Sequence, residues 1–198
     1  LSHKELRDLA ADIARGRASR SMLLGGRHVQ AKLSLTGSAR MGRNVIGVLL
    51  GRDERLRREA VVIGAHYDHL GEGAGEVYFG ANDNAAGVGA MIALAHAFDA
   101  MPQPPRRTLV FVAFDAEEIG RLGSRHYVEH PCVAMDQTAL MINFDMIGRN
   151  DPDAIYAVAS RSSPELHEIH QQANRHVGLS LVHPVSYRLG RSDHTFFY

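Results

Sequence analysis

Three continuous apolar runs stand out along the chain, at residues 60–65, 108–114 and 138–144. Each has the length and the β-branched content of a strand that is buried on both faces, as in a parallel sheet. Shorter or alternating patterns predict four further strands, which in chain order cover 28–35, 44–51, 154–160 and 180–185. The charged residues 52–59 predict a hairpin turn after the second of these four.

Apolar residues at helical spacing separate these strands. Residues 1–14 predict an amphipathic helix, residues 124–129 a short helix, and residues 164–176 a helix that opens on a proline. The longest pattern begins after Asp83 and Asn84, either of which can cap it. Strands that alternate with helices in this way predict an α/β fold. We expect a three-layer sandwich in which helices cover both faces of a central mixed, largely parallel sheet.

Polar groups follow the buried strands at the points where the strands end. In a parallel sheet these ends meet at one edge, where the ligands of α/β proteins bind. The groups that the pattern brings to this edge are His66, Asp68, His69, Asp83, Asp115, Glu117, Glu118, Asp145, Asp193 and His194. Taken singly, a histidine after a strand is most often a hydrogen-bonded loop residue, and two adjacent glutamates most often face solvent.

The number of carboxylates at one edge argues for a bound cation. Carboxylates that converge without a counter-charge repel one another and raise their own pKa values. A divalent metal removes this conflict, and histidine with carboxylate but without thiolate suits zinc, or manganese or cobalt in its place. A set of two histidines and three carboxylates suits two metals that share one carboxylate and activate a single water.

Composition excludes several other kinds of protein. The 198 residues carry 22 basic and 22 acidic side chains, so the net charge gives no case for nucleic acid or an anionic membrane as partner. No apolar run approaches the roughly 18 residues that span a bilayer, and no signal peptide is visible. Cys132 is the only cysteine, which excludes an intramolecular disulfide and a cysteine-rich zinc site.

Taken in chain order, the motifs resemble those of the co-catalytic dizinc aminopeptidases, the bacterial leucyl aminopeptidase type within the MH clan of zinc exopeptidases. The matching stretches are VVIGAHYDH, GANDNAAGVGAMIALA, VFVAFDAEEIGRLGSRHYV, NFDMIGR and RSDHTFF. The resemblance implies a phosphorylase/hydrolase-like zinc peptidase fold. It also implies an aminopeptidase that hydrolyses the N-terminal bond of peptides with a free N-terminus, through a water that bridges two Zn²⁺ ions, or Mn²⁺ or Co²⁺ in their place.

The resemblance also implies which residues bind the two metals. His66 and Asp145 would bind one ion, and Glu118 and His194 would bind the other. Asp83 would bridge both ions. Without the resemblance, the sequence supports only the residue types and their common edge, and the pairing of ligands with ions stays open.

Three further roles follow from the same resemblance. Asp68 would orient the ring of His66 from behind the metal, in the usual carboxylate–histidine arrangement. Glu117 would bind no metal and would act as general base on the bridging water. Tyr187 is a candidate for stabilising the oxyanion, because it carries a phenolic donor a few residues before RSDH.

The chain departs from the family pattern in places. Asn82 stands before Asp83 where many relatives have a carboxylate, and Arg121 replaces a commonly apolar residue. The chain stops four residues after His194, where relatives continue with another strand and a terminal helix. We therefore expect either a C-terminally truncated chain or a compact variant that covers an exposed sheet edge by oligomerisation.

The sequence also predicts two parts of the chain and leaves related functions open. Residues 1–26 are predicted to be an N-terminal helix and connection, left from a neighbouring domain, and residues 27–198 the catalytic domain. The alternatives on the same fold are a carboxypeptidase or dipeptidase, a single-zinc glutaminyl cyclase, and an inactive binding module. The complete ligand set argues against the last two. Because most relatives are secreted or periplasmic, we expect an extracellular or periplasmic location.

Overall fold

The computed structural model divides into two compact units, Leu1–Ala39 and Arg40–Tyr198. The residues that it describes are 3–15, 30, 32–34, 40–73, 75–149, 151–158, 163–183 and 191–197. In the first unit the predicted amphipathic helix is α1 (His3–Ala14). The strand predicted at 28–35 is not formed at residues 30 and 32–34, where Leu33 is 86% exposed, and its other residues lie outside the described ones.

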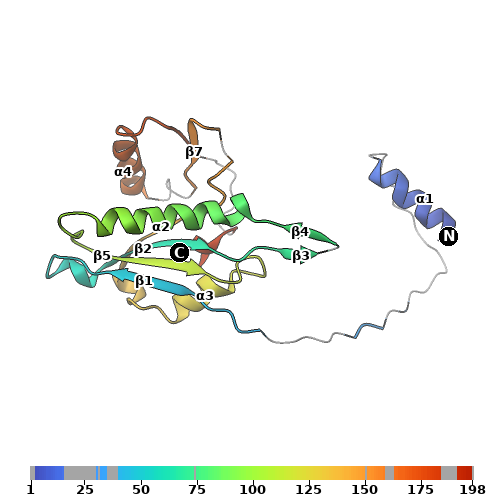
Figure 1. Cartoon of the computed structure of the whole chain (residues 1–198), viewed down its shortest axis with the longest axis horizontal. Coiled ribbons are helices and arrows are strands. Elements are labelled where there is room, and N and C mark those ends of the chain that lie inside the picture. Colours follow the sequence, from blue (N-terminus) through green and yellow to red (C-terminus); the bar gives the residue numbers. More distant parts are fainter. Residues whose placement is uncertain are drawn as a thin grey trace. The chain divides into compact units, whose positions relative to one another are not determined.

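The second unit is built on a four-stranded sheet (Figure 1). Its strands, in spatial order, are β1 (Val45–Leu49), β5 (Thr108–Phe114), β2 (Ala60–His66) and β6 (Thr138–Asn143). The last three run parallel to one another, and β1 runs antiparallel to β5. The prediction of a mixed, largely parallel sheet is therefore confirmed.

The prediction that residues 52–59 form a hairpin turn between β1 and β2 is wrong. Residues 52–59 contain a short 3₁₀ turn, Leu56–Arg58, and lead into β2, but β5 lies between β1 and β2. A charged stretch marks an exposed connection equally well whether the two strands are paired or separated. The local pattern therefore cannot determine which strands are neighbours.

Helices α2 (Ala86–Asp99) and α3 (Leu122–Glu129) cover opposite faces of the sheet, as Figure 1 shows. On one face Val62 packs in a cluster with Tyr127 of α3. On the other face its neighbour Ile63 packs in a cluster with Met91 of α2. Successive strand residues point to opposite faces, so a strand covered on both sides must be apolar at every position. This explains the three continuous apolar runs.

Smaller elements surround this core. The glycine-rich stretch after β2 forms a hairpin of β3 (Gly71–Gly73) and β4 (Glu76–Tyr78). Farther along the chain, β7 (Ala154–Tyr156) and β8 (Ser180–Val182) pair in parallel, and α4 (Pro164–Asn174) lies between them in sequence. The last described element is a short turn, Asp193–Phe197. Within the described part of the chain, no helix is long and apolar enough to cross a membrane.

The parallel strands bring their carboxyl ends to one edge, as the sequence predicts. His66 at the end of β2 pairs with Phe114 at the end of β5. The first turn of α2 is fixed at the same edge by Asn84, whose side chain donates to the backbone oxygen of Phe144 at 2.9 Å. Its Oδ1 accepts from the backbone nitrogen of Gly87 at 3.2 Å, so Asn84 satisfies a donor of this turn.

Two glycines of α2 provide a test of this packing. A Cβ at Gly87 would overlap the side chain of Asn84 and lie 2.6 Å from the backbone oxygen of Phe144, whereas a Cβ at Gly89 meets nothing within 4 Å. We expect Gly87→Ala to lower the free energy of unfolding by roughly 1–3 kcal/mol. Gly89→Ala should raise it by about 0.5–1 kcal/mol, because alanine loses less entropy in a helix. Denaturant unfolding followed by circular dichroism compares the two, and equal effects would contradict the packing.

Candidate metal centre

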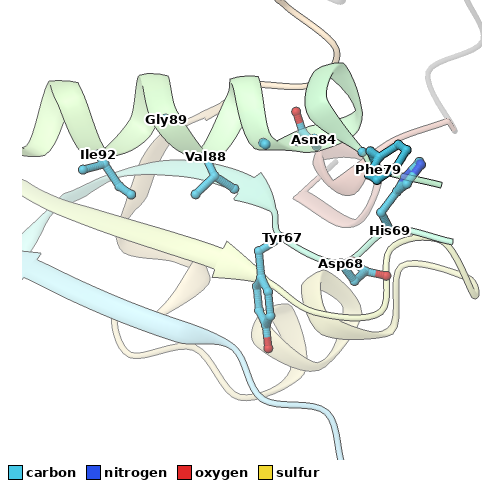
Figure 2. Close-up of a pocket in the computed structure, with 10 residues that line it drawn as sticks. Tyr67, Asp68, His69, Phe79, Asn84, Val88, Gly89 and Ile92 are labelled. Carbon is cyan, nitrogen blue, oxygen red and sulfur yellow. The ribbon is translucent and has the colours of Figure 1, made fainter. Parts of the chain in front are cut away.

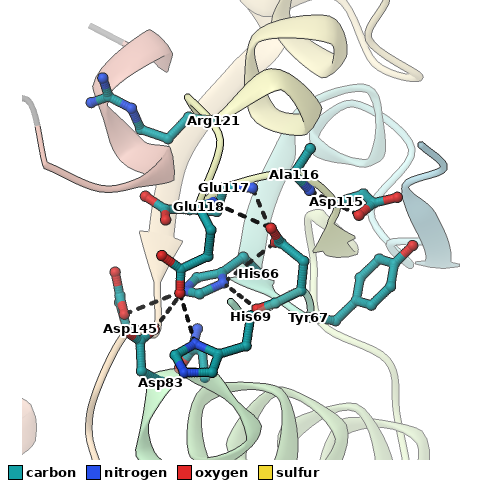
Figure 3. Close-up of polar contacts among 12 residues, drawn as sticks. His66, Tyr67, His69, Asp83, Asp115, Ala116, Glu117, Glu118, Arg121 and Asp145 are labelled. Carbon is teal, nitrogen blue, oxygen red and sulfur yellow. Dashed lines mark hydrogen bonds and ion pairs between the residues drawn. The ribbon is translucent and has the colours of Figure 1, made fainter. Parts of the chain in front are cut away.

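A first group of possible metal ligands converges at the end of β2 (Figure 3). It consists of His66, Asp83 and Asp145, whose ligand atoms all lie within 4.8 Å of one another. The Nε2 atom of His66 lies 3.1 Å from Asp83 Oδ1 and 3.6 Å from Asp145 Oδ1. Two ligand atoms on one tetrahedral zinc, each about 2.0 Å from the ion, are separated by about 3.3 Å. The spacing of this group therefore fits a zinc ion.

A second group lies beside the first and shares one carboxylate with it. It consists of His69, Asp83 and Glu118, and its ligand atoms also lie within 4.8 Å of one another. Asp83 precedes α2, in a turn that covers Ala81–Ala85. A carboxylate common to two neighbouring ligand groups has the position of a bridging ligand, which is the role that the resemblance assigns to Asp83.

Asp68 connects the histidine of the first group to the loop that carries both glutamates. The Nδ1 atom of His66 donates to the backbone oxygen of Asp68 at 3.1 Å, which leaves Nε2 to face the two carboxylates. The carboxylate of Asp68 accepts from the backbone nitrogens of Glu117 at 3.0 Å and Glu118 at 3.2 Å. The hydrogen bond to the imidazole is therefore made by the carbonyl of Asp68 and not, as expected, by its carboxylate, whose Oδ1 lies 3.6 Å from Nδ1. The carboxylate instead holds the glutamate loop.

Asn44 closes the same loop from the other side. Its Oδ1 accepts from the backbone nitrogen of Asp115 at 3.1 Å, and its Nδ2 donates to the backbone oxygen of Gly123 at 2.8 Å. Gly123 in turn donates from its backbone nitrogen to the oxygen of Asp115 at 2.9 Å. Both ends of the segment that carries Glu117 and Glu118 are thus held together. No sequence pattern marks Asn44 as part of the site, because one asparagine before a strand is an ordinary feature.

Glu117 belongs to neither ligand group, although it is adjacent to Glu118. The pKa of Glu117 is raised to about 7. Burial is the largest cause, and the negative charges of Asp193, Asp145 and Glu118 add to it, while the charge of His66 acts in the opposite direction. A carboxyl group that binds and releases a proton near neutral pH is suited to general base catalysis. Glu118, by contrast, lies in the second ligand group.

Asp145 provides a second observation that fits a cation. Its Oδ2 accepts from the hydroxyl of Ser192 at 2.6 Å, but its buried Oδ1 has no hydrogen-bond partner among the described residues. Burial alone would raise the pKa of this carboxyl, yet the nearby imidazole of His66, 3.6 Å from Oδ1, the hydrogen bond from Ser192 and the charge of His194 hold it below its usual value. An ionised, buried oxygen without a donor is an oxygen that a metal can satisfy.

Of the five predicted metal ligands, His194 alone is not brought into these groups. His194 lies half-buried in the turn Asp193–Phe197 and is outside both groups, although its charge contributes to the lowered pKa of Asp145. Its role as a ligand stays a prediction. Tyr187 lies outside the described residues. His69, which stands at the strand end in the motif HYDH, takes a place in the second group that the resemblance did not assign to it.

In protein stripped of metal, we expect the free energy of unfolding to fall as the pH rises from about 5 to about 9. Burial lowers the pKa of His66, but the nearby carboxylate of Asp145, with the charges of Glu117 and Asp193, outweighs it and raises the pKa from 6.5 to about 9. The pKa of Glu117 rises from 4.5 to about 7. Groups with a raised pKa stabilise the folded state below their unfolded-state value and lose that contribution as the pH passes the folded-state value.

The windows are therefore pH 4.5 to about 7 for Glu117 and 6.5 to about 9 for His66. Thermal unfolding in excess chelator, at pH values spaced across this range, measures the slope. A midpoint that rises steadily over the same range would show that these two groups do not dominate the electrostatics of the metal-free site.

Comparisons with known proteins find relatives for most of the chain. Residues 44–198 match peptidase family M28. Aminopeptidase YwaD of Bacillus subtilis is 33% identical over 107 residues, which cover 54% of this chain and 22% of that protein. A probable glutamate carboxypeptidase of Arthroderma benhamiae is 30% identical over 159 residues, 78% of this chain and 19% of that protein.

A solved structure extends the likeness to the fold. The crystal structure of BSAP, a zinc aminopeptidase from Bacillus subtilis, aligns with a TM-score of 0.59 and 30% identity, over 78% of this chain and 36% of that one. The chain spans at most 36% of the length of these three proteins. The family match nevertheless covers the sheet, both covering helices and every residue of the two ligand groups. The chain therefore belongs to peptidase family M28.

Proposed function

We propose that the protein is a zinc-dependent aminopeptidase that binds two metal ions and hydrolyses the N-terminal bond of peptides. The observation that carries the proposal is the pair of ligand groups joined through Asp83. His66 and Asp145 would hold one ion with Asp83, and Glu118 would hold the other, with His194 as its remaining ligand. The likeness to zinc aminopeptidases supports the choice of metal and reaction.

The residues of the chain divide the chemistry among them. When bound, the two ions would lower the pKa of a water and polarise the carbonyl of the scissile bond. Glu117 takes the proton of the attacking water and passes it to the nitrogen of the leaving amine. Asp68 holds the backbone of Glu117 in place through the hydrogen bond at 3.0 Å, so that the carboxyl group meets the water in a fixed position.

A carboxypeptidase is the second candidate, because a relative named as a probable glutamate carboxypeptidase matches 78% of the chain. The two activities differ in which terminus of the substrate must be free. We expect the zinc-loaded protein to release the chromophore from an aminoacyl anilide and to leave a peptide with a blocked N-terminus intact. The assay compares both substrates at equal concentration. Cleavage of the blocked peptide alone would replace the aminopeptidase proposal with the carboxypeptidase.

The likeness to known peptidases also bears on where the protein is located. We propose an extracellular or periplasmic location, which a relative named as a probable lipoprotein aminopeptidase of Mycobacterium tuberculosis supports. Fractionation of cells that make the protein tests this, and recovery in the cytosol alone would contradict it. Oligomerisation through a sheet edge also stays a prediction. The edge strand β1 carries the exposed side chains of Val45, Ile46 and Val48.

A further inference from the structure

His69 lies in the second ligand group without a role in the proposed reaction. Its Nδ1 atom is 2.7 Å from Oε1 of Glu118, and both side chains are about four-fifths buried, at 20% and 17% exposure. Figure 3 shows the imidazole directed at the carboxylate, on the side where Asp83 lies. The contact joins the end of β2 to the glutamate loop, across 49 residues of sequence.

The chain leaves room for the imidazole at this place. A Cβ at Gly80 would lie 2.9 Å from Cγ and 3.0 Å from Cβ of His69, and Gly80 has a φ of 65° that favours glycine. On the open side, His69 lines a hollow of about 370 Å³ together with Asp68 and Phe79 (Figure 2). Backbone on one side and Glu118 on the other therefore restrict the ring to few orientations.

The distance between His69 and Glu118 decides between two roles for the histidine. Two ligand atoms on one tetrahedral zinc lie about 3.3 Å apart, as the 3.1 Å and 3.6 Å distances of the first group illustrate. The 2.7 Å between His69 Nδ1 and Glu118 Oε1 is shorter and has the length of a hydrogen bond between an N–H group and a carboxylate. This nitrogen and this oxygen are therefore not spaced as two ligands of one ion.

We propose that His69 is a positioning residue for the metal that Glu118 binds. Its Nδ1–H donates to Oε1 and fixes the carboxylate in the orientation from which Glu118 binds the ion. Carboxylates that bind metals are themselves held by such hydrogen bonds, and loss of one weakens metal binding by about 10–100-fold. The inference rests on the proposed function, because it requires an ion at Glu118.

The test compares two substitutions of His69 by metal affinity instead of by activity. His69→Ala removes the donor, whereas His69→Asn keeps an N–H group near the place of Nδ1 but is a poor zinc ligand. Zinc is titrated into metal-stripped protein in competition with a chromogenic chelator, which gives the affinity for each ion. We expect His69→Ala to lower the affinity for one of the two ions by about 10–100-fold. The affinities of His69→Asn should stay within about threefold of those of the wild type.

Two controls separate this role from others. His96→Ala removes an exposed imidazole of α2 outside both ligand groups and should leave both affinities unchanged. Thermal midpoints of the metal-free variants show whether each one is folded. If His69→Ala is not folded, the comparison is made between His69→Asn and the wild type. An asparagine variant that loses as much affinity as the alanine variant would overturn the inference, since His69 would then bind the ion itself.

Failure of the proposed function has a different signature in the same titration. A wild-type protein that binds fewer than two ions overturns the proposed function, and the inference with it. A wild-type protein that binds two ions, with affinities that His69→Ala leaves unchanged, overturns the inference alone.

Discussion

Glu117→Gln lowers turnover by about 10²–10⁴-fold and leaves both metal ions bound, because Glu117 is the base of the proposed reaction and belongs to neither ligand group. The amide keeps the size of the side chain but cannot accept the proton of the attacking water. Its backbone hydrogen bond to Asp68 is unaffected by the change, so the loop should keep its place. Steady-state kinetics and the zinc content of the same sample measure the two effects together.

The adjacent residue is the matched control for this experiment. Glu118→Gln should lower the affinity for one ion, since an amide oxygen is a weaker ligand than a carboxylate and Glu118 lies in the second ligand group. If Glu117→Gln empties the site while Glu118→Gln leaves the metal content intact, the roles of the two glutamates are the reverse of those proposed. A Glu117→Gln variant with full activity would remove the general base from the mechanism.

Asp83→Asn should release both metal ions, whereas Asp145→Asn should release one. Asp83 is the carboxylate that the two ligand groups share, and Asp145 belongs to the first group alone. An uncharged amide at the shared position weakens the binding of both ions. It also removes a negative charge that offsets the repulsion between the two cations. Inductively coupled plasma mass spectrometry after dialysis gives the number of ions per chain. Equal losses in the two variants would show that Asp83 does not bridge.

The core of the fold could be predicted from the sequence because it depends on burial. A strand covered by α2 on one face and α3 on the other has no position for a polar side chain, and Val62 and Ile63 of β2 show this alternation directly. The polar residues that end these apolar runs can also be recognised in the sequence. His66 and Asp145 follow or end parallel strands that lie side by side, so the sequence predicts that they meet.

Other features depend on contacts between distant segments, which no local pattern encodes. The position of β5 between β1 and β2 decides that residues 52–59 are not a hairpin turn. Asn44 holds both ends of the glutamate loop, but its residue type and position are ordinary. The hydrogen bond of His69 to Glu118 depends on the space that Gly80 leaves, and neither motif alone indicates that the two side chains meet.

The most direct test of the two-metal site is anomalous diffraction from crystals of the zinc-loaded protein, measured above and below the zinc absorption edge. The account predicts two peaks at the carboxyl edge of the sheet, one between His66 and Asp145 and one beside Glu118, with Asp83 between them. A single peak at this edge, or peaks elsewhere on the protein with none beside Asp83, would contradict it.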